Sequence, residues 1–313
     1  MYTIGIDLGG TNIAVGLVKD RQVIVQKTSA PTRPARGRDA VLSDIAALCK
    51  KVAGDAGVSP SDVACVGIAV PGGVDTGSGR ILFTPNIPFS DFCVTEELSA
   101  RLDGLPVRAV NDANAAALAE TLVGAGKGAE NAVMITLGTG VGGGIVIGGK
   151  LYTGANGLAA ELGHFVIQAG GVPCGCGRKG CFEAYGSATA LVRMAREELD
   201  KCFVSGEETS IPPACDNAKA VFAAYADGDS VAARILDRYT DGLACGVTSL
   251  INIFQPDVLI LGGGVSGAGQ PLLDLLRPKI DAEDFARTAP VRTRLCLAAC
   301  GNDAGILGAA LLD

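Results

Sequence analysis

The stretch YTIGIDLGGTNIAVGLV, at residues 2–18, decides the fold of this chain of 313 residues. It contains two apolar runs, Tyr2–Ile6 and Ile13–Val18, on either side of a Gly-rich turn. Runs of this length, rich in β-branched residues, predict strands, and a third strand is predicted at Val23–Gln26. The chain is therefore expected to begin with three short strands in succession.

The same order of predicted strands and turns occurs twice along the chain. A strand, a Gly-rich turn and a strand recur at 133–137, 138–144 and 145–147. The spacing of apolar residues predicts that helices and strands follow each of these strand–turn–strand segments. In the first half they are helices at 38–53, 95–102 and 113–122 and strands at 63–70 and 107–110. In the second half they are helices at 187–201, 217–226, 230–253 and 303–312 and strands at 258–261 and 294–298. This repetition indicates an internal duplication and an α/β fold.

Composition argues against several classes of protein. The net charge is -7 and no basic block occurs, which disfavours nucleic acid and anionic membranes as partners. The most apolar stretch, 132–147, is interrupted by threonine and glycine, so no membrane span is expected. The first strand is not preceded by a basic leader segment. The chain has 11 cysteines, and an odd number is typical of proteins whose thiols stay free in a reducing compartment. We therefore expect a cytoplasmic protein.

Two Gly-rich turns are candidate phosphate-binding loops. Glycine lets backbone N–H groups approach an anion closely, and threonine hydroxyls add donors. One such turn is usually only a hairpin, but one in each half favours a clamp on a triphosphate. The second turn is followed by a strand and neither contains Gly-Lys-Ser/Thr, which excludes Rossmann and Walker motifs. The predicted residues are Gly9, Gly10, Thr11 and Asn12 in the first loop and Thr136, Gly138, Thr139 and Gly140 in the second.

A compact group of metal-ligating residues lies in the second half. The only histidine, His164, precedes Cys174, Cys176 and Cys181, and three of the 11 cysteines thus fall within eight positions. Three cysteines and one histidine form a standard ligand set for structural zinc, with no position left open for catalysis. The alternative is that the cysteines are small buried apolar residues and His164 belongs to the core. The clustering favours zinc.

These motifs, in this order, resemble the ROK family of sugar kinases. The resemblance rests on the two loops, the Asn111-Asp112-Ala113-Asn114 segment, Glu161-Leu-Gly-His164 and the cysteine cluster, and it covers essentially the whole chain. Within the family the chain is most similar to the bacterial glucokinases. The family also includes repressors with an N-terminal helix-turn-helix domain, for which a first phosphate loop at residue 7 leaves no room. The resemblance therefore implies a kinase.

The resemblance implies an actin-like, ribonuclease-H-like ATPase fold with two α/β domains around a cleft. The small domain is expected to comprise residues 1–113 and 302–313. The large domain is expected at 114–301, with the zinc-binding segment at 161–183. Members of the family suggest a homodimer or homotetramer. The implied cofactors are ATP, Mg²⁺ and structural Zn²⁺.

A catalytic base is needed to accept the proton of a sugar hydroxyl. With His164 assigned to metal, a carboxylate must serve, and Asp112 at the end of strand 107–110 is the best candidate. The alternative is that Asp112 only caps the next helix. The matching Asp in the family is the base, and Asp7 matches its Mg²⁺-handling acid.

The family's pattern also assigns the sugar and the adenosine. The residues that match its sugar-binding positions are Gly72, Asn86, Asn111, Asp112, Glu161, His164 and Glu183. His164 would serve twice, with one ring nitrogen on the metal and the other on a sugar hydroxyl. The residues that match the adenosine turn are Gly262, Gly263 and Gly264, although an ordinary strand-to-helix loop would look the same.

The expected reaction is ATP-dependent phosphorylation of a hexose, with glucose as the expected sugar, at its 6-hydroxyl. Many members of the family have a bulkier, often aromatic residue near the loop at Asn86, where this chain has Thr84, Ile87, Pro88 and Phe89, and this departure leaves other sugars open. The alternatives are N-acetylmannosamine, N-acetylglucosamine, fructose and allose, or a sugar-sensing protein without catalysis. A redox protein is disfavoured, because the single residue between Cys174 and Cys176 would strain a disulfide.

Overall fold

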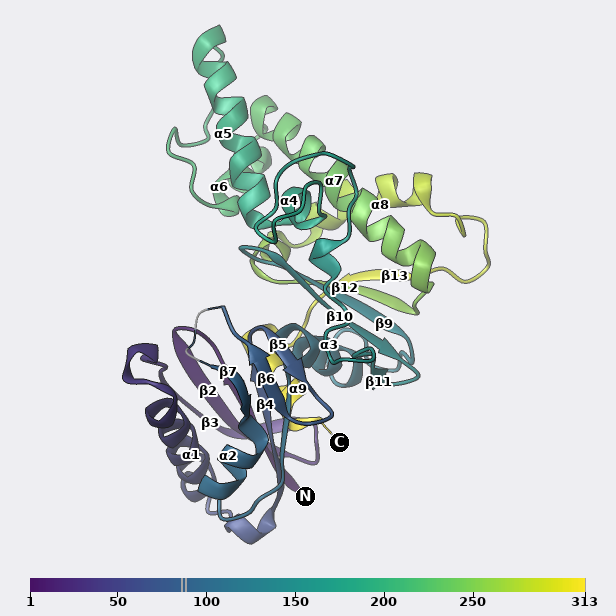
Figure 1. The fold of residues 1–313 in the computed structure, drawn as a ribbon. Coiled ribbons are helices and arrows are strands. Elements are labelled where there is room, and N and C mark those ends of the chain that lie inside the picture. The colour runs from purple at the N-terminus through teal and green to yellow at the C-terminus, as the bar shows by residue number, and fades with distance from the viewer. Residues whose placement is uncertain (86, 88, 313) are drawn as a thin grey trace. The chain divides into compact units, whose positions relative to one another are not determined.

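The computed structural model describes residues 1–85, 87 and 89–312 (Figure 1). The chain forms two compact units. The first comprises Met1–Glu130, Gly144–Ala160 and Ala299–Asp313, and the second comprises Asn131–Gly143 and Glu161–Ala298. Among the described residues no helix is long and apolar enough to cross a membrane.

A five-stranded sheet forms the centre of the first unit. Its order is β3-β2-β1-β4-β8. The first three strands are antiparallel neighbours, whereas β1, β4 and β8 run parallel. The strands are β1 (Tyr2–Leu8), β2 (Asn12–Lys19), β3 (Val23–Pro31), β4 (Val63–Val70) and β8 (Val107–Asn111). Strands β1, β2 and β4 are almost continuously buried, which fits a sheet covered on both faces, and the unbroken apolar sequence of β4 predicts this burial. The edge strand β3 alternates between exposed and half-buried residues.

Helices cover this sheet. The helices of the first unit are α1 (Arg38–Asp55), α2 (Val94–Arg101), α3 (Asp112–Leu122) and α9 (Ala304–Ala310). The buried residues of α1 and α2 join the apolar core beneath β1 and β4, and Figure 1 shows the two helices side by side. A small sheet in the order β5-β6-β7 comprises β5 (Gly73–Asp75), β6 (Arg80–Phe83) and β7 (Ser90–Cys93).

Helix α9 packs closely against β1 and β4, because the residues of these strands that face its backbone are glycines. A Cβ on Gly5 would lie 1.9 Å from the carbonyl oxygen of Ile306. One on Gly67 would lie 1.8 Å from that of Ala309. Any side chain at either position would therefore push the C-terminal helix off the sheet.

The second sheet repeats the order of the first. It runs β11-β10-β9-β12-β13, with β10 and β11 antiparallel and β9, β12 and β13 parallel. Its strands are β9 (Ala132–Leu137), β10 (Val141–Ile147), β11 (Lys150–Leu151), β12 (Val258–Gly262) and β13 (Arg294–Leu297). The common order agrees with the internal duplication predicted from the repeated signals.

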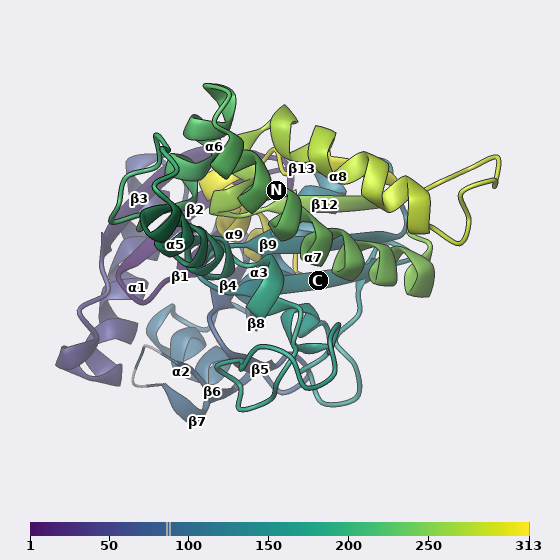
Figure 2. The same ribbon diagram turned by 90° about the horizontal axis from the view of Figure 1, so that it is seen from above.

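The helices of the second unit form a layer in which α7 and α8 run side by side (Figure 2). They are α4 (Glu183–Gly186), α5 (Ala188–Ser205), α6 (Ala218–Ala226), α7 (Ser230–Phe254) and α8 (Gln270–Glu283). Helix α8 was not predicted, because it holds Pro271 near its start and Pro278 inside it, and proline usually interrupts a helix. The long α7 buries thirteen residues at helical spacing, which is why its sequence was easy to interpret.

Candidate functional site

Polar residues gather at one edge of the first sheet. Because β1, β4 and β8 are parallel, their carboxyl ends lie at the same edge. Asp7 lies near the end of β1 and pairs with Ala69 of β4, while Val70 of β4 pairs with Asn111. Ligands of α/β proteins bind at such carboxyl edges. This edge therefore carries the predicted base, the predicted Mg²⁺ acid and part of the predicted sugar site.

Asn111 ties two of these elements together. Its Oδ1 accepts hydrogen bonds from the backbone N–H groups of Ala113 (2.9 Å) and Asn114 (3.2 Å), so it is the N-cap of α3. Its Nδ2 donates to the carbonyl oxygen of Gly72 (3.0 Å). Gly72 has φ +99°, and a Cβ there would lie 2.4 Å from the oxygen of Phe83, so only glycine fits.

Asp112 is the first residue of α3 rather than its cap. Its side chain is exposed, and its Oδ1 accepts a hydrogen bond from the N–H of Ala113 (2.8 Å). The alternative to a catalytic role, that Asp112 is only the N-cap, does not hold, since Asn111 occupies that position.

Asp7 and Asp112 influence each other electrostatically. Burial, and then the negative charge of Asp112, raise the pKa of Asp7 to about 6. Gly305 of α9 lies so close that a Cβ there would be 2.6 Å from the Asp7 carboxyl carbon. Two carboxylates at one sheet edge, one of them partly buried, form an environment that a cation would stabilise.

The first phosphate loop, residues 7–12, is held by the end of β3. The N–H of Gly9 donates to the carbonyl oxygen of Asn12 (2.9 Å). The buried Thr32 donates its hydroxyl to the oxygen of Gly9 (2.6 Å) and its N–H to that of Thr11 (2.9 Å). This role of Thr32 was not predicted, because the third strand was expected to end at Gln26, whereas the observed β3 continues to Pro31 and brings Thr32 to the loop.

The second phosphate loop, residues 137–141, lies beside the predicted adenosine turn. Thr136 of β9 pairs with Gly262 of β12, so the two turns follow neighbouring parallel strands. Gly263 has φ +82°, and a Cβ there would lie 2.6 Å from the backbone nitrogen of Leu137. Glycine at this position therefore allows the two turns to touch.

Glu183 contacts the second loop. Its Oε2 accepts a hydrogen bond from the N–H of Val141 (3.0 Å). A Cβ on Gly140 would lie 2.3 Å from the same oxygen. Its Oε1 accepts a hydrogen bond from the thiol of Cys174 (3.4 Å). The carboxylate thus joins the cysteine cluster to the loop.

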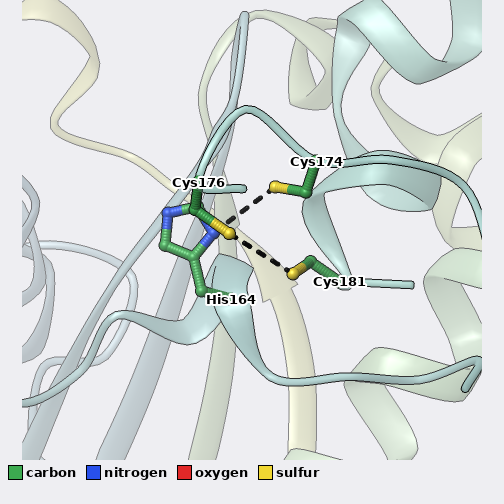
Figure 3. Close-up of side chains that lie close together, drawn as sticks. All are labelled: His164, Cys174, Cys176 and Cys181. Carbon is green, nitrogen blue, oxygen red and sulfur yellow. Dashed lines mark hydrogen bonds between the residues drawn. The ribbon is translucent and has the colours of Figure 1, made fainter. Parts of the chain in front are cut away.

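The histidine and the three cysteines converge in space (Figure 3). One ligand atom from each of His164, Cys174, Cys176 and Cys181 lies within 4.8 Å of the other three. The Sγ atoms of Cys176 and Cys181 are 3.6 Å apart, and Nδ1 of His164 is 3.7 Å from Sγ of Cys174. Tetrahedral zinc with normal bond lengths would put two sulfurs about 3.8 Å apart and a sulfur and a nitrogen about 3.6 Å apart. A disulfide would need about 2.05 Å. The donor set and its spacing therefore fit zinc.

Short backbone bonds shape this cluster. The N–H of Cys174 donates to the oxygen of Arg178 (2.9 Å), and the N–H of Gly177, at φ +87°, donates back to Cys174 (3.0 Å). Arg178 also donates its guanidinium to the carbonyl oxygen of His164 (3.1 Å). In Figure 3 the Nδ1 of His164 faces the sulfurs, and the other ring nitrogen lies on the opposite side of the ring. That second nitrogen remains available to another partner.

The model of the ROK family matches residues 3–313. This chain belongs to the ROK family. A glucokinase from Thermotoga maritima is 42% identical over 310 residues, which cover 98% of this chain and 95% of that protein. An N-acetylmannosamine kinase from Salmonella typhimurium is 33% identical, over 100% of this chain and 98% of that protein.

A solved ROK structure has the same fold. The crystal structure of a ROK family glucokinase from Streptomyces griseus, in complex with glucose and AMPPNP, is 35% identical. It superimposes with a TM-score of 0.78, over 99% of this chain and 98% of that one. The actin-like α/β ATPase fold predicted from the ROK resemblance is therefore confirmed.

The predicted site residues fall into separate groups within this ROK chain. Asp7, Gly72, Asn111 and Asp112 lie in the first unit, whereas the second loop, the adenosine turn and the cysteine cluster lie in the second. Glu161 is exposed and precedes the short 3-10 turn Leu162–His164. Asn86 lies outside the described residues. Their assigned roles in binding and catalysis stay predictions, as do the domain boundaries at 113, 114, 301 and 302.

Proposed function

We propose that this chain transfers the γ-phosphate of ATP to the 6-hydroxyl of glucose. The support comes from the glucokinase relative at 42% identity and from the structure with glucose and AMPPNP at 35% identity. The observation in this chain that carries the proposal is Asp112 at the carboxyl edge of the first sheet, beside Asp7. A sugar-sensing protein would need neither an acid–base pair nor two phosphate loops.

Asp112 is proposed to act as the general base. Its carboxylate would accept the proton of the 6-hydroxyl while that oxygen attacks the γ-phosphorus and ADP departs. Its place at the start of α3 is fixed by the neighbouring cap, so the carboxylate need not hold the helix by itself.

Asp7 is proposed to hold Mg²⁺, directly or through water. The fit rests on its raised pKa, since a carboxylate disfavoured by burial and by Asp112 gains from a neighbouring cation. When bound, Mg²⁺ would neutralise charge on the phosphates of ATP. Thr11 and Gly10 would contribute a hydroxyl and a backbone N–H from the first loop.

The cysteine cluster is proposed to bind structural zinc. Four protein ligands leave no open coordination position, so the role is to order the segment 161–183. That segment includes Glu161, His164 and Glu183, three of the residues proposed to bind sugar hydroxyls. An ATP-dependent kinase with thiol ligands suits a reducing cytoplasm. A homodimer or homotetramer remains our expectation for the assembly.

Glucose is preferred over other sugars in this proposal. The proposed polar groups would pair with its equatorial hydroxyls, and an epimer would leave a buried partner unpaired, at a cost of about 1–3 kcal/mol. N-acetylmannosamine is the second candidate, because a kinase for that sugar is 33% identical over the whole chain.

A panel of sugars tests the assignment. The purified chain should phosphorylate glucose with a kcat/KM at least about tenfold above that for mannose, fructose, N-acetylmannosamine and N-acetylglucosamine. A coupled assay for ADP at saturating ATP gives the ranking. A higher kcat/KM for either N-acetylhexosamine would overturn the choice of glucose and leave the kinase mechanism in place.

A further inference from the structure

We propose that Thr189 is a positioning residue of the second phosphate loop, and that the segment 183–189 couples the metal centre to nucleotide binding. This inference rests on the proposed function. Thr189 is the second residue of α5 and belongs to none of the predicted motifs. Its hydroxyl donates a hydrogen bond to the carbonyl oxygen of Thr139 (2.7 Å).

Three hydrogen bonds join the segment to the loop. Besides the bond from Thr189, the N–H of Ala188 donates to the carbonyl oxygen of Gly138 (2.8 Å). Glu183 accepts from the N–H of Val141 (3.0 Å) at the other end of the loop. The loop residues 138–141 are thus held at both ends by one stretch of seven residues.

The two bonds from α5 determine which way the loop's N–H groups point. In a trans peptide the C=O and the following N–H point in opposite directions. Because the oxygens of Gly138 and Thr139 are turned toward α5, the N–H groups of Thr139 and Gly140 point away from it. Neither N–H has a hydrogen-bond partner in the part of the chain that the structure describes. They are therefore oriented as donors for an anion such as a phosphate of ATP.

The segment begins two residues after Cys181, a proposed metal ligand, and buried contacts hold the chain on both sides of Glu183. Cys181 and Phe182 are both fully buried, and the N–H of Phe182 donates to the oxygen of Phe165 (2.8 Å). A Cβ on Gly246 of α7 would lie 2.2 Å from the Phe182 ring. The buried Tyr239 donates its hydroxyl to the oxygen of Gly186 (2.7 Å). Displacement of Cys181 would therefore be passed along the chain to Thr189 instead of being absorbed.

The position of Glu183 points the same way. One oxygen contacts the thiol of Cys174, a proposed zinc ligand, and the other contacts the loop at Val141. Glu183 therefore lies between Cys174 and the loop. A zinc-bound Cys174 is a thiolate and cannot donate this hydrogen bond, so the main-chain route through Phe182 carries the coupling when the metal is bound. Loss of the metal should consequently loosen the loop as well as the sugar-binding residues.

The test is the affinity for AMPPNP, measured by calorimetry on the zinc-loaded chain. Thr189→Val keeps the shape of the side chain and removes the donor, so AMPPNP should bind about two- to tenfold more weakly. Thr189→Ser keeps the hydroxyl and should bind within about twofold of the unchanged chain. Glucose affinity and zinc content should be unaltered in both variants.

Thr293→Val is the matched control. Thr293 makes an equivalent hydroxyl-to-carbonyl bond, to Pro256 (2.8 Å), which does not involve the loop. This variant should bind AMPPNP as the unchanged chain does. Chelation of the zinc should weaken the binding of AMPPNP to the unchanged chain. Thr189→Val should weaken AMPPNP binding by a smaller factor in the chelated protein than in the zinc-loaded protein.

Unchanged AMPPNP affinity in Thr189→Val, or in zinc-free protein that remains folded by circular dichroism, would overturn the inference. If the chain binds AMPPNP and Thr189→Val weakens that binding while no sugar is phosphorylated, the proposed function fails and the inference stands. If glucose is phosphorylated and the variants bind AMPPNP equally, the inference alone fails.

Discussion

The two phosphate loops have similar sequences but different supports. The first loop, at residues 7–12, is held by Thr32 at the end of β3, within the first unit. The second, at 137–141, is held by Glu183, Ala188 and Thr189, which follow the cysteine cluster in the chain. A Gly-rich turn alone does not show what orients its N–H groups. Our proposal predicts that the orientation of the second loop depends on the metal centre and that the orientation of the first loop does not.

The largest expected effect is on kcat and comes from Asp112, which belongs to neither loop. Asp112→Asn keeps the shape of the side chain at the start of α3 and removes the proton acceptor. We expect kcat to fall about 10²- to 10⁴-fold, with glucose and AMPPNP affinities nearly unchanged. Steady-state kinetics and calorimetry measure the two effects. A variant that kept more than a tenth of the original kcat would place the base elsewhere.

Removal of a proposed metal ligand tests most directly whether only the second loop depends on the metal centre. Cys181→Ser should lower the zinc content, the melting temperature and the affinity for glucose, because Glu183 lies only two residues after Cys181 in the chain. Backbone amides of Thr139 and Gly140 should exchange with deuterium at least about threefold faster, whereas those of Gly9 and Gly10 should not change. Cys49→Ser, at a buried cysteine outside the cluster, controls for general destabilisation. Equal acceleration in both loops would mean that the loops do not differ in their dependence on metal.

The electrostatic environment of Asp7 sharpens the account of the first loop. The raised pKa of Asp7 means that the folded chain binds its proton more tightly than the unfolded chain, so stability falls as pH rises from about 4 to 6. Asp7→Asn should therefore increase the free energy of unfolding by about 1–3 kcal/mol at pH 8 and change it little below pH 4.

The substitution that increases stability should decrease activity. Asp7→Asn should raise the KM for MgATP, and in the unchanged chain kcat/KM for MgATP should decline below pH 6 as Asp7 is protonated. Denaturant titrations at pH 4 and 8 measure the stability effect. A variant less stable than the unchanged chain at pH 8 would contradict the environment assigned to Asp7.

Much of the fold was predictable from local patterns. Strand β4 was predicted at its observed bounds, and α7 to within one residue, because both have long, regular apolar patterns. The small sheet at 73–93 was not predicted, because its strands are three or four residues long. Helix α8 was hidden by its two prolines.

The site was predictable where residue type and spacing carry the chemistry. The cysteine and histidine ligands were found in the sequence, and the structure brings them together. Thr32 and Thr189 were not found, because a single hydroxyl that supports a loop has no pattern in sequence; it is defined by tertiary contacts. The capping role of Asn111 was missed because the helix was predicted to begin at residue 113, one residue after its observed start, which put Asp112 at the cap position.

The central claim is transfer of the γ-phosphate of ATP to the 6-hydroxyl of glucose. It is tested most directly by NMR identification of the product formed by the purified chain from glucose and MgATP. The account predicts glucose 6-phosphate and ADP in equal amounts, with phosphorus coupled to the protons at C6. ATP hydrolysis without sugar phosphorylation, or phosphate on a different hydroxyl, would contradict it.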